Sequence, residues 1–158
     1  MNFTDWDERC MALALEEATR AADRGEVPVG AVLTRGEEVL AHCGNAQIDL
    51  NDPTAHAEIR VLREAGVRGG NYRLPDTTLY VTLEPCTMCC GALVHARISN
   101  LIFAAREPRA GAVVSAGATL DHAALNHRVA WQEGLLSDES AALLQQFFKA
   151  RRVEKPQS

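Results

Sequence analysis

The stretch that decides the fold is TLYVTLEPCTMC, residues 78–89. Its first six residues are mostly β-branched, aromatic or aliphatic, which predicts a strand over 78–83. Pro85 suits the first position of a following helix, because proline lacks an N–H that the first helical turn leaves unpaired anyway. We therefore expect the strand to deliver Cys86 and Cys89 to the first turn of a helix. Being three residues apart, the two thiols would share one face of that helix.

A third metal donor lies upstream in the run His56-Ala57-Glu58. One imidazole and two thiolates provide three zinc ligands, whereas a structural zinc site closes with four. A catalytic zinc keeps its fourth position for water. Glu58 can move protons on that water without binding the metal. The sequence H-x-E followed by P-C-x-x-C is the signature of zinc-dependent nucleobase deaminases.

The spacing of His56 and Glu58 restricts where the metal can sit. Thr54 predicts the N-cap of a helix that begins near Ala55 and ends at Gly66. On an ideal helix, residues two apart point about 200° away from each other. His56 and Glu58 can therefore converge only if the metal lies off the end of the helix. Two helix N-termini would then face one metal ion.

Two other interpretations of the cysteines remain open on spacing alone. An isolated C-x-x-C can be a thioredoxin-like redox pair, although such pairs need no upstream His-x-Glu. Cys90 lies four residues after Cys86 and shares its face, so it could supply a fourth, structural ligand. We interpret Cys90 as a small packed residue, which is the usual role of a free cysteine.

Composition indicates a single globular domain. The chain has 158 residues, which suits one domain spanning 1–158, and it has no stretch apolar enough to cross a membrane. Five cysteines, an odd number, fit a reducing cytoplasm better than a disulfide scaffold. The net charge of −5 and the pI of about 5.5 speak weakly against nucleic acid as a partner.

The rest of the chain alternates strand and helix patterns. Thr4 and Asp7 predict a capping box that opens a first helix, which ends at Arg24. Alternation of strands and helices implies parallel pairing with helices on the faces of a sheet. A final helix is expected over 138–152, followed by a short tail, 153–158. The other expected strands are 29–34, 38–42, 101–104 and 129–132, and the Gly- and Ala-rich segment 107–117 is expected to be a loop at the rim of the site.

Five blocks resemble the bacterial tRNA-specific adenosine deaminases, a family of the cytidine deaminase superfamily. The zinc motifs alone indicate only the superfamily, and the C-terminal blocks favour the narrower family. The likeness runs from the first helix to Arg152. The blocks are EVPVGAV (26–32), DPTAHAEI (52–59), TLEPCTMC (82–89), NHRV (126–129) and FFKARR (147–152).

The resemblance implies an α/β fold, a three-layer α/β/α sandwich around a mixed five-stranded sheet, in a homodimer. It implies that His56, Cys86 and Cys89 hold one zinc ion per chain and that Glu58 shuttles protons. The implied reaction is hydrolytic deamination of adenosine to inosine at the wobble position of a tRNA anticodon loop. The target base would have to leave its stack to react.

The resemblance also implies a set of substrate contacts. Asn45, which otherwise reads as a turn residue at a strand end, is expected to bind the target base. The C-terminal helix mixes aromatic and basic residues, although cations there could simply complement the helix dipole. The expected substrate-binding residues are Asn45, Ala57, Glu107, Phe148, Arg151 and Arg152.

Two alternative functions share the same motifs. A deaminase of a free base or nucleoside, of the guanine or cytidine type, would use the same zinc core. It would have a small closed pocket and no need for a basic C-terminus. A non-catalytic, zinc-stabilised interaction module would have four protein ligands and would not depend on Glu58.

Overall fold

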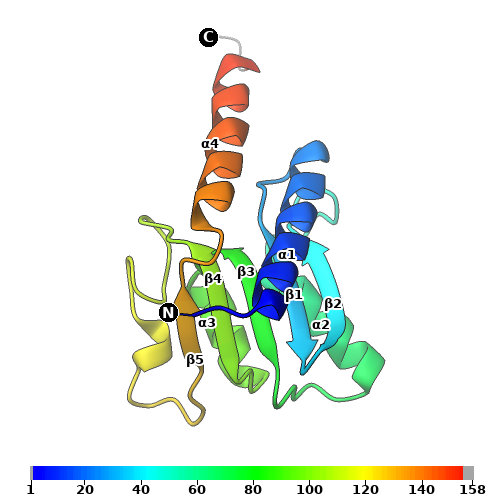
Figure 1. The fold of residues 1–158 in the computed structure, drawn as a ribbon, viewed down its shortest axis with the longest axis vertical. Coiled ribbons are helices and arrows are strands. Elements are labelled where there is room, and N and C mark those ends of the chain that lie inside the picture. The colour runs from blue at the N-terminus through cyan, green and yellow to red at the C-terminus, as the bar shows by residue number, and fades with distance from the viewer. Residues whose placement is uncertain (1, 155–158) are drawn as a thin grey trace.

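The computed structural model describes residues 2–154, which form one five-stranded sheet with helices on both sides (Figure 1). The spatial order of the strands is β2-β1-β3-β4-β5. The elements in chain order are α1 (Asp5–Asp23), β1 (Gly30–Arg35), β2 (Glu38–Gly44), α2 (Ala57–Gly69), β3 (Thr78–Leu83), α3 (Thr87–His95), β4 (Asn100–Ala105), a 3₁₀ turn (Thr119–Asp121), β5 (Ala130–Glu133) and α4 (Ser137–Glu154).

The sheet is mixed, as expected from the sequence. β1 runs antiparallel to both β2 and β3, whereas β3, β4 and β5 run parallel to one another. The parallel pairs are joined through helix α3 and through the long segment after β4, which contains only a 3₁₀ turn, because parallel strands need a long crossover connection. The predicted strand 78–83 is confirmed residue for residue.

Side chains on the two faces of the sheet build two separate cores. In β1, Ala31 and Leu33 point to one face and join the cluster packed under α2 and α3. Val32, between them, points to the other face and joins Met11 and Ala14 of α1. The sheet is thus the middle layer of the predicted α/β/α sandwich, which is confirmed.

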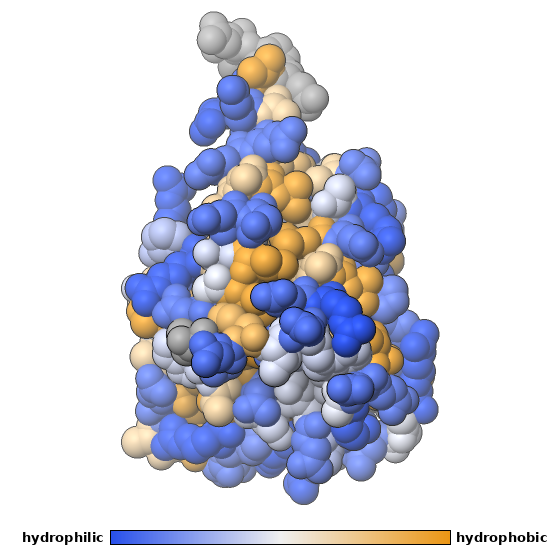
Figure 2. All heavy atoms as spheres, viewed as in Figure 1, coloured by the Kyte–Doolittle hydropathy of each residue, from blue (hydrophilic) through white to orange (hydrophobic). Residues whose placement is uncertain are grey.

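Helix α1 lies unusually close to the sheet. A Cβ added at Gly30 would overlap the carbonyl of Ala14, so only glycine permits this approach. The helix begins with the predicted capping box, in which Thr4 and Asp7 each accept a hydrogen bond from the other's backbone N–H at 3.0 Å. α4 covers β3 and β4 and then extends beyond the sheet (Figure 1). Hydrophobic side chains gather between α1 and α4 (Figure 2).

The start of α2 differs from the prediction. Thr54 is not the N-cap, because its N–H and hydroxyl both donate to Asp52 Oδ1, at 2.9 and 2.7 Å. His56 is the N-cap instead, and the helix begins at Ala57. Its predicted end at Gly66 is also wrong: the helix continues to Gly69 and ends at Gly70, whose φ of 67° suits glycine.

The start of α3 is shifted in the same way. Cys86, rather than Pro85, borders the helix: it is the N-cap, and its carbonyl accepts the first helical bond, from the Cys90 N–H. Pro85 lies outside the helix, where its carbonyl accepts the Ala112 N–H at 2.8 Å. Both corrections move a predicted zinc ligand to the very tip of a helix.

The C-terminal helix is confirmed and is slightly longer than predicted. It covers Ser137–Glu154, so Val153 is helical, and residues 155–158 of the predicted tail lie outside the described residues. Within residues 2–154, each helix is too short or too polar to span a membrane.

Candidate active site

Three side chains that could bind a metal converge where α2 and α3 begin. His56 Nδ1 lies 3.7 Å from Cys86 Sγ and 3.4 Å from Cys89 Sγ. The three donor atoms all lie within 4.8 Å of one another, which is close enough for one ion to contact all three. The structure therefore brings together the three residues that the sequence predicted as zinc ligands.

The two helix ends explain why these side chains meet. His56 is the N-cap of α2, Cys86 is the N-cap of α3, and Cys89 stands in the first turn of α3. Neither N-cap side chain forms a capping hydrogen bond within its helix. The positive ends of two helix dipoles therefore point at the cluster, and they favour the thiolates that zinc binding needs.

Hydrogen bonding within the cluster prepares it for a cation. Bonds from Cys89 and then from His56 lower the pKa of the Cys86 thiol to about 3. The hydrogen bond between Cys89 and Cys86, together with burial, raises the pKa of the Cys89 thiol. The hydrogen bond with Cys86 raises the pKa of His56. These groups hold protons that a metal ion could replace.

The surroundings of the cluster fit a zinc ion with one open position. Cys90, the possible fourth ligand, is fully buried, and its Sγ faces the Pro85 carbonyl at 3.8 Å. Oε1 of Glu58 is buried and has no hydrogen-bond partner among the described residues. An unpaired buried oxygen is costly, so it implies a group bound beside it. Burial also raises the pKa of Glu58, as expected for a proton carrier near neutral pH.

A cavity of about 200 Å³ opens above these residues. Asn45 lines it and is held on two sides: its Oδ1 accepts the Ala57 N–H at 2.9 Å, and its Nδ2 donates to the Val27 carbonyl at 3.2 Å. The Ala57 N–H is therefore already bonded to Asn45. The lining residues are Val27, Val29, Asn45, Gln47, His56, Glu58, Leu83, Glu84, Cys86, Glu107 and Ala110.

About two thirds of the chain matches a family model. Residues 4–105 match the model described as the cytidine and deoxycytidylate deaminase zinc-binding region. The chain is 44% identical to the tRNA-specific adenosine deaminase of Haemophilus influenzae over 153 residues, covering 96% of this chain and 88% of that protein. It is 47% identical to that of Agrobacterium fabrum, covering 91% and 95%. The chain belongs to the family of the tRNA-specific adenosine deaminases.

Solved structures of related deaminases have the same fold. One, from a study of A-to-I editing by tRNA:A34 deaminases at the wobble position of tRNA, matches with a TM-score of 0.84 and 47% identity. That match covers 86% of this chain and 99% of the other. A guanine deaminase from Nitrosomonas europaea matches with a TM-score of 0.75 over 89% and 83% of the two chains. At 23% identity it shows the shared fold alone.

A larger groove adjoins the cavity of this deaminase. It encloses about 820 Å³ and shares Val27, Leu83 and Glu107 with the cavity. The structure places four predicted substrate residues along it, namely Glu107, Phe148, Arg151 and Arg152. Arg106 and Arg109 also line the groove and were missed, although their positions on either side of Glu107 in a rim loop could have indicated them.

The predicted RNA residues of the C-terminal helix differ in how firmly they are held. The Arg151 guanidinium donates to the Gly25 carbonyl and lies 4.7 Å from the centre of the Phe147 ring. Arg151 therefore ties α4 to the segment after α1. Phe148 is 45% exposed and Arg152 is exposed, so both are accessible from the groove.

Glu107 organises its own loop in the deaminase. Its carboxylate accepts hydrogen bonds from the N–H groups of Arg109 and Ala110, at 3.1 and 2.7 Å. Glu107 borders both the cavity and the groove. Glu107 thus shapes the wall between them.

Removing a single thiol should distinguish a three-ligand site from a four-ligand site. We expect Cys89→Ala to lose bound zinc, because two protein ligands remain, and Cys90→Ala to keep one zinc per chain. Elemental analysis of the purified proteins measures this directly. Loss of zinc in Cys90→Ala, or three sulfur neighbours by X-ray absorption, would instead establish a structural site.

Proposed function

We propose that this deaminase converts adenosine to inosine at the wobble position of a tRNA anticodon loop, with one zinc ion held by His56, Cys86 and Cys89. The observation that carries the proposal is the unpaired Glu58 oxygen beside three metal donors, at the base of a cavity that opens into a basic groove. Zinc bound by such donors supplies a Lewis acid that lowers the pKa of water to about 7.

Glu58 carries the protons in the proposed reaction. Its buried carboxylate takes a proton from the attacking water, whose oxygen bonds to C6 of adenine. Glu58 gives this proton to the ring nitrogen. It then takes the second proton, from the new hydroxyl group on C6, and gives it to the amino group, so that the C–N bond breaks, C6 becomes a carbonyl and ammonia leaves. A raised pKa suits both halves of this cycle, because Glu58 must both accept and donate.

Asn45 orients the base in this proposal. Its amide has two N–H donors, and one bond to Val27 leaves the second for a ligand in the cavity. The bonds to Val27 and Ala57 fix the amide before the substrate arrives, so binding costs little further ordering. The end-of-strand position and the substrate role are therefore compatible.

The groove supplies contacts for the flanking nucleotides. Arg106 is neutralised by Glu133, which accepts two parallel hydrogen bonds from it at 2.7 and 2.8 Å. No carboxylate of residues 2–153 pairs with Arg109 or Arg152. These two cations are the best placed to bind phosphates, and the exposed ring of Phe148 can stack on an unpaired base.

The alternatives fit the site less well. A deaminase of free guanine or cytidine needs a closed pocket, whereas this cavity joins a groove about four times its volume. A zinc-stabilised interaction module needs four protein ligands, and the cluster found within residues 2–154 has three.

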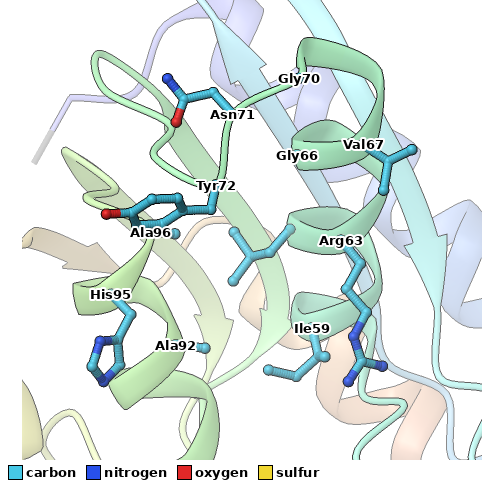
Figure 3. A pocket seen from close by; sticks show the side chains of 11 residues that line it. Ile59, Arg63, Gly66, Val67, Gly70, Asn71, Tyr72, Ala92, His95 and Ala96 are labelled. Atoms are coloured by element: carbon cyan, nitrogen blue, oxygen red, sulfur yellow. The ribbon is translucent and has the colours of Figure 1, made fainter.

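We further propose that the protein is a homodimer formed through α2 and α3. A hollow of about 810 Å³ lies between these helices, flanked by Ile59 and Val67 of α2 and by Ala92 of α3, with Tyr72 at one end (Figure 3). Val67 and Tyr72 are 84% and 70% exposed, which is unfavourable for an apolar patch left in water.

We also propose that residues 1–158 form one domain and that the protein acts in the cytoplasm. One observation supports each proposal. All elements of residues 2–154 pack around the same sheet. All five cysteines are unpaired, as is usual in a reducing compartment.

Substituting Glu58 tests the chemistry. Glu58→Gln preserves shape but cannot accept the proton, so we expect retained zinc and turnover at least ~10²–10⁴-fold lower. The assay maps inosine by sequencing after incubation with total tRNA. Glu64→Gln, on the same helix, is the matched control. Efficient guanine deamination by the wild-type protein without action on tRNA would decide for the small-molecule alternative.

The salt dependence of RNA binding tests the groove. Each lost phosphate contact should flatten the slope of log affinity against log salt by about 0.7–0.9. We expect this change in Arg109→Ala and Arg152→Ala, with little change in thermal stability. Arg151→Ala should mainly lower stability, because Arg151 anchors α4 to Gly25. Unchanged slopes in both exposed-site variants would remove the groove from RNA binding.

Measured mass tests the dimer. The wild-type protein should sediment at twice the 17.2 kDa chain mass. Val67→Lys should shift it toward the monomer, because a buried charge without a partner disfavours association. Val153→Lys, at a similarly exposed valine on α4, should remain dimeric. A wild-type monomer at micromolar concentration would contradict the proposal.

A further inference from the structure

We infer that Glu84 is a positioning residue that closes the loop 107–115 into the wall of the substrate cavity. The inference rests on the proposed deamination, because its consequence is for how the substrate is held. Glu84 follows β3, precedes Cys86 by two residues and lines the cavity, and its carboxylate accepts hydrogen bonds from this loop.

Within residues 2–154, every hydrogen bond that the Glu84 carboxylate accepts comes from the loop. Oε1 accepts the Glu107 N–H at 3.1 Å and the Ser115 hydroxyl. Oε2 accepts the N–H groups of Val113, Val114 and Ser115, at 3.1, 2.9 and 2.9 Å. One buried, charged group therefore joins the beginning of the loop to its end, through bonds of the stronger, charge-assisted kind.

The chain between these ends wraps closely around the carboxylate. A Cβ added at Gly111 would overlap the carboxyl carbon of Glu84, so the backbone passes at a distance that only glycine allows. The next residue, Ala112, donates its N–H to the Pro85 carbonyl. Together these contacts set the loop on the two residues that precede the first cysteine ligand.

This loop supplies the wall that a substrate would touch. Glu107 and Ala110 line the cavity, and Pro108 and Arg109 line the groove. The sheet does not need Glu84 for its own order, because β3 is paired on both sides and the Glu84 N–H is bonded to Ala105. Loss of the carboxylate should therefore release the loop and leave the sheet and the metal donors in place.

The two carboxylate oxygens allow a sharp test with Glu84→Gln. The amide oxygen can replace only one of them, and an NH₂ in the place of Oε2 would face three N–H donors. Glutamine should therefore keep its oxygen toward 113–115 and turn its NH₂ toward the Glu107 N–H. We expect amide hydrogen exchange measured by NMR to accelerate at Glu107 and to change little at Val113 and Val114.

Kinetics on an anticodon stem-loop with a wobble adenosine test the consequence. For Glu84→Gln we expect one zinc per chain and kcat/KM lower by about 10-fold or more, with the larger part of the change in KM. A residue that only stabilised the fold would lower the amount of active protein without raising KM. Glu17→Gln, at a buried glutamate of α1 whose partners lie outside the loop, is the matched control and should change neither reading.

Several outcomes would overturn the inference. In Glu84→Gln, unchanged amide exchange at Glu107 would show that the carboxylate does not hold the loop. Faster exchange with unchanged kcat/KM would show that the loop does not affect the substrate. Loss of zinc would make Glu84 a support of the metal site. If Glu84→Gln does not fold, Ser115→Ala removes one bond and keeps the carboxylate, and it should show the same changes to a smaller degree. If the wild-type protein forms no inosine, the proposed function fails, and the exchange measurement still decides whether Glu84 holds the loop.

Discussion

The structure depends on the meeting of two helix N-termini at one point. An imidazole and a thiol occupy the N-cap positions of α2 and α3, where an ordinary helix would carry a hydroxyl or carboxylate cap. Both helices give up that capping bond, and the free N–H groups leave a positive field that two thiolates can balance. The sheet makes the meeting possible. β3 ends three residues before the first cysteine ligand, and Asn45, which directly follows β2, holds the first turn of α2 through the Ala57 N–H.

Buried carboxylates fix the loops around this point. Glu84 gathers the loop after β4, and Glu26 accepts the N–H groups of Ile48 and Asp49, at 3.1 and 2.8 Å, in the segment that leads to α2. Loops have no ladder of their own, so their N–H groups need acceptors, and an ionised carboxylate can serve several at once. The walls of the cavity are therefore set before substrate binds, and the far end of α4 is tied to the segment after α1 by the bond from Arg151 to Gly25.

The sequence predicted correctly those features that depend on residues close together in the chain. The three metal donors, the strand 78–83 and the capping box of α1 follow from spacing and residue type, and the structure agrees with each. The predicted start of α2 was wrong because the Thr54 hydroxyl could bond either to the first turn of the helix or to Asp52, and it bonds to Asp52. The pairing of Arg106 with Glu133 and the bond from Arg151 to Gly25 join residues 27 and 126 positions apart, and no sequence period encodes them. Glu84 was overlooked for the same reason.

The partners of the carboxylates near the site explain how an acidic chain can bind RNA. A net charge of −5 counts every carboxylate equally, but several near the site are turned inward. Glu84 faces backbone N–H groups, Glu107 caps its own loop, and Glu133 is paired with Arg106. Hydrogen bonds from neutral groups leave the charges of Glu84 and Glu107 in place, whereas the charges of Glu133 and Arg106 largely cancel at a distance because the two form an ion pair. Arg109 and Arg152 keep their charge toward the groove, so the surface offered to phosphates is more positive than the composition suggests.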